Sequence, residues 1–164
     1  MLIQGDILMK AFVFWPLTAA ASAAAGFALS CLYGILPHPL SALVSPVSTA
    51  FHELLKIFYF PYPLTLLLLD RRVQLSRSLR GGFYLAALAS PLFFFSCRGL
   101  AGLCGLHSPY FDLGLYLVTI AGGTLFAACR RSSPRLSRAA PWLFLPFALY
   151  GLLLVSLTLL RPYG

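Results

Sequence analysis

Long apolar runs without a single charge are the feature that most constrains this chain. Residues 11–36 and 139–160 are both uncharged, and the second run is 22 residues long. A helix that crosses the ~30 Å hydrocarbon core of a bilayer needs about 20 apolar residues. A water-soluble domain usually has about 25% charged residues, whereas this chain has 10% and is 60% hydrophobic. We therefore expect an all-α integral membrane protein.

The apolar runs predict five membrane helices that form a single domain over all 164 residues. Their approximate ranges are 11–36, 48–69, 81–97, 109–129 and 139–160. Ser108 followed by Pro109 is a typical start for the fourth helix, because serine caps helices and proline fits their first turn. Prolines inside the second, third and fifth helices remove backbone donors and predict kinks at Pro61, Pro63, Pro91 and Pro146.

The basic residues predict how these helices are oriented. With five helices, the N-terminus and two loops share one side, which carries nine basic residues: Lys10, Arg71, Arg72, Arg77, Arg80, Arg130, Arg131, Arg135 and Arg138. The other side carries only Arg98 and Arg161 outside the helices. Because basic loops favour the cytoplasm, we expect a cytoplasmic N-terminus and an external C-terminus. The net charge of +8 is thus explained by membrane orientation, and no nucleic-acid partner is expected.

The first predicted helix has a face of small residues. Ser22, Gly26, Ser30 and Gly34 follow one another at intervals of four. Such faces let another helix approach closely in lipid. We prefer the interpretation that this neighbouring helix belongs to the same bundle. The alternative is a helix from a second copy of the chain or from another membrane protein. Residues 21–23 also resemble a signal-peptide cleavage site, but the apolar run is longer than a typical signal sequence, so we expect no cleavage.

His52 and Glu53 begin a segment with the outline of the zinc-peptidase motif H-E-x-x-H. Lys56 occupies the position of the second histidine, and an ammonium group cannot bind a metal. A catalytic zinc needs three protein ligands, and the four cysteines lack paired C-x-x-C spacing. We therefore expect neither a metal nor another cofactor. Cys31, Cys97 and Cys104 are expected on the same outer side, where both a disulfide and free thiols stay open.

Residues 45–61, S-P-V-S-T-A-F-H-E-L-L-K-I-F-Y-F-P, resemble a signature of a bacterial membrane-protein family. The family is catalogued as domain of unknown function number 6512, and its signature reads roughly F-P-V-N-E-S-x-W-E-H-x-K-L-x-F-F-P. The matching positions are Pro46, Val47, Glu53, Lys56, Phe60 and Pro61. Asp112 resembles the family's acidic residue at the start of a later helix. Gly122 or Gly123 would correspond to a glycine within that same helix.

The chain departs from this signature at Ser48, Thr49, His52 and Leu54. Leu54 replaces the family's histidine, so a function that relies on that histidine is not expected here. The resemblance implies a divergent multi-helix protein of the bacterial cytoplasmic membrane, and it implies no particular activity.

Polar residues in and near the second helix predict a pocket that faces outward. The candidates are Glu53, Lys56, Asp112 and His52, with Arg98 and His107 at the rim. Glu53 and Lys56 are three residues apart, so they share a helix face and can pair. Ionisable residues within membranes are functional candidates. The alternative is structural, with an ion pair and a carboxylate that anchor helix ends at the membrane surface.

These observations leave three functions open. The first is binding or transport of a small solute in the pocket, either with or without coupled movement of protons. The second is a membrane enzyme that uses Glu53 as an acid or base, although we expect no enzyme. The third is a non-catalytic assembly subunit that uses the small-residue face. The expected partners are the lipid bilayer and either further copies of the chain or another membrane protein.

Overall fold

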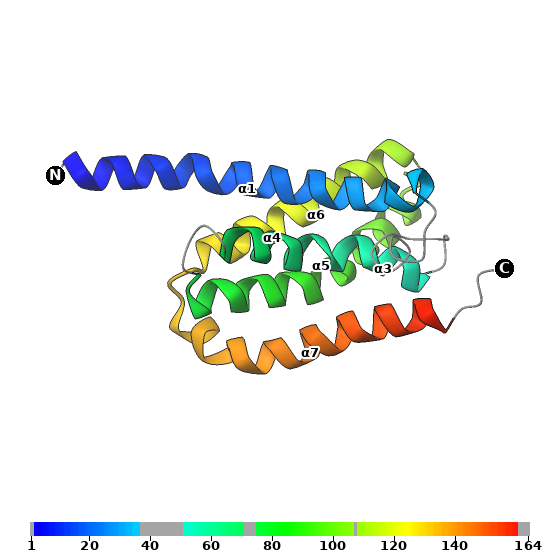
Figure 1. The fold of residues 1–164 in the computed structure, drawn as a ribbon. Coiled ribbons are helices and arrows are strands. Elements are labelled where there is room, and N and C mark those ends of the chain that lie inside the picture. The colour runs from blue at the N-terminus through cyan, green and yellow to red at the C-terminus, as the bar shows by residue number, and fades with distance from the viewer. Residues whose placement is uncertain (1, 37–50, 71–74, 107, 161–164) are drawn as a thin grey trace.

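The computed structural model describes residues 2–36, 51–70, 75–106 and 108–160, and side chains before residue 15 and at 30, 33 and 51–53 fall outside this description. All regular elements in these segments are helices, so the predicted all-α fold is confirmed. They are α1 (Leu2–Ile35), α3 (Phe51–Tyr59), α4 (Pro61–Asp70), α5 (Arg77–Leu103), α6 (Pro109–Cys129) and α7 (Pro134–Leu159) (Figure 1).

Several helices extend beyond the uncharged runs from which their ranges were predicted. α5 starts four residues before the predicted 81–97, where the Ser76 side chain accepts a hydrogen bond from the Leu79 amide at 3.2 Å. α7 starts before the predicted 139–160, and Ser133 accepts from the Leu136 amide at 3.5 Å. α1 likewise begins at Leu2, ahead of 11–36. Ser76 and Ser133 set the starts of α5 and α7, because their side chains accept hydrogen bonds from first-turn amides. The arginines that follow are good helix formers and do not interrupt these helices.

Within the predicted second helix, 48–69, the described residues form two helices, α3 and α4, that meet at Phe60. Its two prolines, Pro61 and Pro63, have no amide hydrogen with which to continue the helical bonds. The Phe60 amide still donates to the Lys56 carbonyl at 3.0 Å, and the Leu64 amide donates to the Phe60 carbonyl at 3.2 Å. α3 and α4 are therefore separated by a break in the helix, and no loop lies between them.

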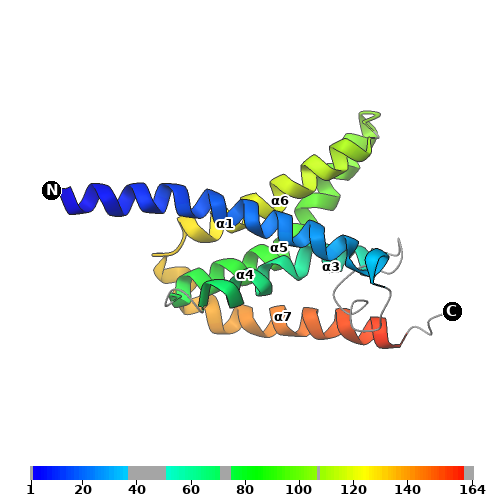
Figure 2. The same cartoon turned by 45° about the horizontal axis from the view of Figure 1, so that its top comes forward.

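The helices form a bundle in which α5 packs extensively against both α6 and α7, while α1 packs mainly against α6. Figure 1 shows α1 and α7 on opposite sides, with α4 and α5 between them. The end of α5 and the start of α6 form a hairpin that swings away from the other helices (Figure 2). This hairpin leaves room for a cavity beside α3.

Two adjacent glycines bring three helices into backbone contact. A Cβ added to Gly81 would lie 2.9 Å from the Leu136 carbonyl oxygen of α7. A Cβ added to Gly82 would lie 2.8 Å from the Ala127 Cα of α6. The Gly81–Gly82 pair therefore allows close packing where α5 and α7 begin and α6 ends.

The small-residue face of α1 packs partly within this bundle. Ser22 is buried and shares a 2.7 Å hydrogen bond with Thr65 of α4. Gly26 packs so closely against Tyr116 and Pro61 that a Cβ there would overlap both. Gly34 is exposed and a Cβ there would meet nothing within 4 Å, while the Ser30 side chain lies outside the description.

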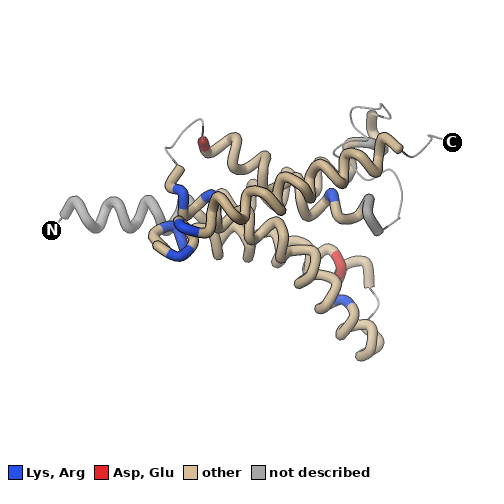
Figure 3. Tube along the Cα trace, turned by 90° about the horizontal axis from the view of Figure 1, so that it is seen from below, with Lys and Arg blue, Asp and Glu red and all other residues tan. Residues whose placement is uncertain are grey.

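Three of the described helices, α5, α6 and α7, are long and apolar enough to cross a membrane. The described arginines divide between their ends (Figure 3). One end carries six: Arg77, Arg80, Arg130, Arg131, Arg135 and Arg138. Arg98 lies toward the other end. α1 begins at the arginine-rich end, and α7 finishes at the opposite end (Figure 1).

Candidate functional site

A cavity of about 260 Å³ opens beside the α5–α6 hairpin, and we name it the Asp112 cavity. Four helices line it, with Phe27 from α1, Leu54, Ile57 and Phe58 from α3, Phe94, Phe95 and Arg98 from α5, and Asp112, Leu113 and Tyr116 from α6. Two charged groups thus share a small space that is otherwise mainly apolar and aromatic.

The charged groups form an ion pair that links the two helices of the hairpin. Arg98 Nη2 lies 3.1 Å from Asp112 Oδ2, and the side chains are 51% and 34% exposed. Asp112 occupies the first turn of α6, where the helix dipole stabilises a carboxylate. A pair this exposed contributes only about 0–1 kcal/mol to stability. Both groups can therefore exchange this contact for a ligand at little cost.

Aromatic rings form the inner wall of the cavity. The Phe58 ring lies 4.7 Å from the Phe94 ring, 5.6 Å from the Tyr116 ring and 6.1 Å from the Phe95 ring, measured between centroids. Tilted and edge-on pairs of this kind add about 0.5–1.5 kcal/mol each beyond their burial. The wall presents aromatic surface that suits apolar groups and cations.

Tyr116 adds a polar group that sequence reasoning missed. Its hydroxyl is buried and has no hydrogen-bond partner among the described residues. A buried hydroxyl without a partner costs about 1–3 kcal/mol. In the sequence, a tyrosine within an apolar helix looks like any core aromatic residue, and no spacing pattern marks it. Only the packing against Gly26 and Pro61 shows where its hydroxyl lies.

The structure brings some predicted pocket residues together and separates others. Arg98 and Asp112 share the cavity, whereas Lys56 is 0% exposed and is not one of the lining residues. At 3.6 residues per turn, Lys56 lies roughly 150° around α3 from the lining side chains. The side chains of Glu53 and His52, and all of His107, lie outside the description.

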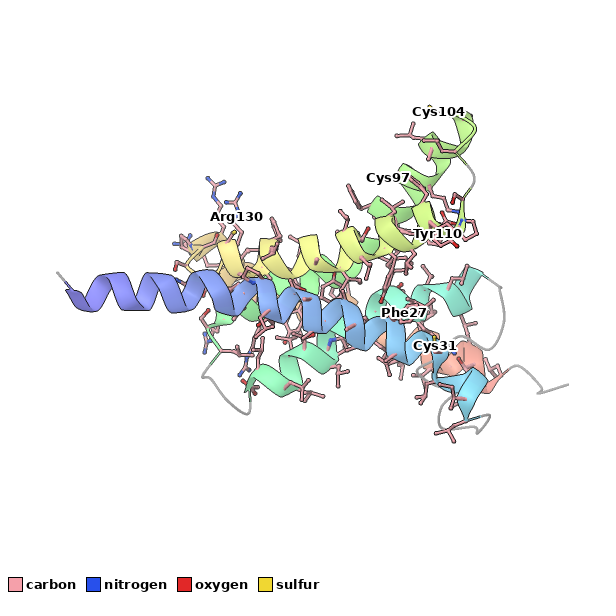
Figure 4. The ribbon with its side chains drawn as sticks, turned by 90° about the horizontal axis from the view of Figure 1, so that it is seen from above. Phe27, Cys31, Cys97, Cys104, Tyr110 and Arg130 are labelled. Atoms are coloured by element: carbon pink, nitrogen blue, oxygen red, sulfur yellow. The ribbon has the colours of Figure 1, made fainter. Side chains whose placement is uncertain are left out.

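Neither a disulfide nor a metal cluster is found among the described residues. Cys97, Cys104 and Cys129 are free thiols. Figure 4 shows Cys97 and Cys104 on the hairpin formed by α5 and α6, and Cys31 on α1. Within the described ranges, no three His, Cys, Asp or Glu residues are placed to hold a metal ion.

The structure is thus a helical bundle with three membrane-length helices and a small cavity lined by charged, apolar and aromatic side chains. No family model matches the chain, and no curated protein or solved structure is similar to it. The resemblance of residues 45–61 to a family of unknown function therefore stays a prediction. The function has to be inferred from the geometry of the cavity.

Proposed function

We propose that the chain is a multi-pass protein of the bacterial cytoplasmic membrane that binds a small amphipathic zwitterion in the Asp112 cavity. Three membrane-length helices support the membrane location, and the resemblance of residues 45–61 supports a bacterial one. The Arg98–Asp112 pair at an aromatic wall is the observation that carries the binding function.

The proposed ligand follows from the chemistry of the lining groups. Arg98 can bind a carboxylate, and Asp112 with the neighbouring rings can bind an ammonium group. Phe58 and Phe94 offer apolar surface to the remainder of the molecule. The cavity, at about 260 Å³, is smaller than the usual range of about 300–1,000 Å³ for drug-sized ligands, so the solute is small.

Thermal unfolding in detergent tests this proposal with three related probes. L-Phenylalanine carries both charges, phenethylamine lacks the carboxylate and 3-phenylpropanoate lacks the ammonium group. A ligand at about a hundred times its Kd stabilises a protein by about 2.7 kcal/mol. For a chain of this size that is a rise in melting temperature of roughly 5–10 °C. We expect this rise with phenylalanine and a clearly smaller rise with each single-charge probe.

Two variants and a matched control complete the test. Arg98→Gln and Asp112→Asn should abolish most of the rise, whereas Arg135→Gln, an exposed arginine on α7, should retain it. Equal shifts with all three probes, or an unchanged shift in both cavity variants, would contradict the proposal.

The proposed orientation predicts the location of the C-terminus. A reporter that folds only outside the cytoplasm should be active when it is fused after Gly164, because the arginine-rich end is assigned to the cytoplasm. The same reporter inserted after Ser132, between α6 and α7, should be inactive. Cytoplasmic exposure of both fusion sites would overturn either the orientation or the number of spans.

A further inference from the structure

A second cavity, of about 290 Å³, lies between the start of α5 and the first turns of α7. Arg77 and Arg80 line it from the first turn of α5, and Tyr84 lies one turn further along. Pro141 and Phe144 line it from α7. The cavity thus has a strongly basic part next to an aromatic and apolar part.

The basic part carries charge that the described residues do not neutralise. Six described arginines gather at this end, and Asp70 is the one described acidic residue near them. Asp70 accepts a hydrogen bond from Arg80 at 2.8 Å, with both side chains about half exposed. Arg77 is exposed and makes no ion pair within the described ranges. Among the described residues at this end, six arginines and one aspartate leave a net charge of +5.

The start of α5 adds locally to this positive potential, whereas the start of α7 at the same side is offset by the end of α6. α5 and α7 both start here, at Arg77 and Pro134. The start of a helix is equivalent to about half a positive charge. An anion at the mouth of the cavity would therefore interact with Arg77, with Arg80 and with the start of α5.

The apolar part continues toward the outside of the bundle. Tyr84 packs against Phe144 and Phe147, with ring centroids 5.6 Å and 4.7 Å apart. On the same stretch of α7, Trp142 is 79% exposed and Leu145 is 59% exposed. Tryptophan is enriched where membrane proteins meet the lipid headgroups. A ligand that covers this surface needs an apolar tail as well as an anionic head.

We infer that this cavity binds an anionic phospholipid. The phosphate lies between Arg77 and Arg80, and the glycerol and upper acyl chains lie against Tyr84 and Phe144. Basic pockets between membrane helices on the cytoplasmic side suit such headgroups. Inorganic phosphate would share the arginine contacts but would leave the aromatic surface uncovered. The inference rests on the membrane location proposed above, and it is independent of the solute in the Asp112 cavity.

Native mass spectrometry of the detergent-solubilised protein can test this site with two lipids of identical acyl chains. We expect phosphatidylglycerol to bind in preference to phosphatidylcholine. Each basic side chain near a headgroup is worth about a fivefold change in binding. Arg77→Gln should therefore reduce phosphatidylglycerol binding roughly fivefold, whereas Arg135→Gln should change it less than twofold. Arg135 is the matched control, because it removes the same charge from the same end without lining the cavity.

Three outcomes would overturn the inference. The first is equal binding of the two lipids by the parent protein. The second is an equal loss in the Arg77→Gln and Arg135→Gln variants, which would indicate a general effect of charge. The third is complete displacement of the lipid by millimolar inorganic phosphate, which would indicate a free-phosphate site.

A salt titration of the parent protein gives a measurement that does not depend on any variant. Salt screens exposed charges, so the preference for phosphatidylglycerol should fall as salt is added. A preference that salt leaves unchanged would contradict the arginine contacts. Failure of the phenylalanine experiment alone would leave this site intact, because the lipid site depends on the membrane location and not on the Asp112 cavity.

Discussion

Replacing Lys56 with methionine is expected to lower the free energy of unfolding by about 3–5 kcal/mol. Lys56 is 0% exposed in the middle of a helical bundle, and a buried ammonium group requires a charged or strongly polar partner. From the spacing of three residues we expect Glu53, one helical turn before Lys56, to be this partner. Removing the lysine would leave that carboxylate unpaired. Thermal or denaturant unfolding in a single mild detergent measures the effect.

The double variant Glu53→Gln with Lys56→Met separates loss of the pair from loss of packing. It should recover much of the stability, because no unpaired charge remains. Arg138→Met provides a control for removing a basic residue from an exposed site, where changes stay within about 0.5 kcal/mol. If Lys56→Met is as mild as Arg138→Met, the ammonium group is hydrated and the assignment of Glu53 fails.

Replacing Gly82 with leucine is expected to disrupt the packing of α5 against α6. A Cβ at Gly82 would lie 2.8 Å from the Ala127 Cα and 3.0 Å from its Cβ, and neither atom can rotate away as a flexible side chain would. Overpacking typically costs about 1–3 kcal/mol. We expect the upper end of this range, because the two backbones must separate.

Gly122→Leu is the matched control on α6, since a Cβ there would meet nothing within 4 Å. Its stability should stay within about 0.5 kcal/mol of the parent. Melting temperature and elution volume of both variants, measured in one detergent, make the comparison. Similar melting curves for the two leucine variants would show that α5 and α6 do not meet at Gly82.

The sequence predicted those parts of the fold that depend on local properties. Helix content follows from the apolar runs, because the thickness of a bilayer sets the length of a span. The kink predicted at Pro61 appears as the break between α3 and α4. α5 and α7 start earlier than the uncharged runs predict, because serine caps and helix-forming arginines precede those runs.

The site was harder to predict, because it depends on how each helix is rotated about its axis. Arg98 and Asp112 were both candidates, and the structure joins them in an ion pair. Lys56 was grouped with them, yet it lies across α3 from the cavity they share. The rotation of α3 is set by its packing against α1, α5 and α7, and no pattern within residues 48–69 contains that information.

The burial of Lys56 also has a consequence for how the chain is assembled during synthesis. α3 packs against α7 through Tyr59, whose ring lies 4.9 Å from Phe147 and 5.1 Å from Tyr150, between centroids. A ribosome delivers these α7 residues more than eighty positions after Lys56. A nascent chain that lacks α7 would lack the aromatic cover that Phe147 and Tyr150 give to α3 at Tyr59. The packing of α3, the helix that carries the buried Lys56, is therefore completed only after α7 has been synthesised.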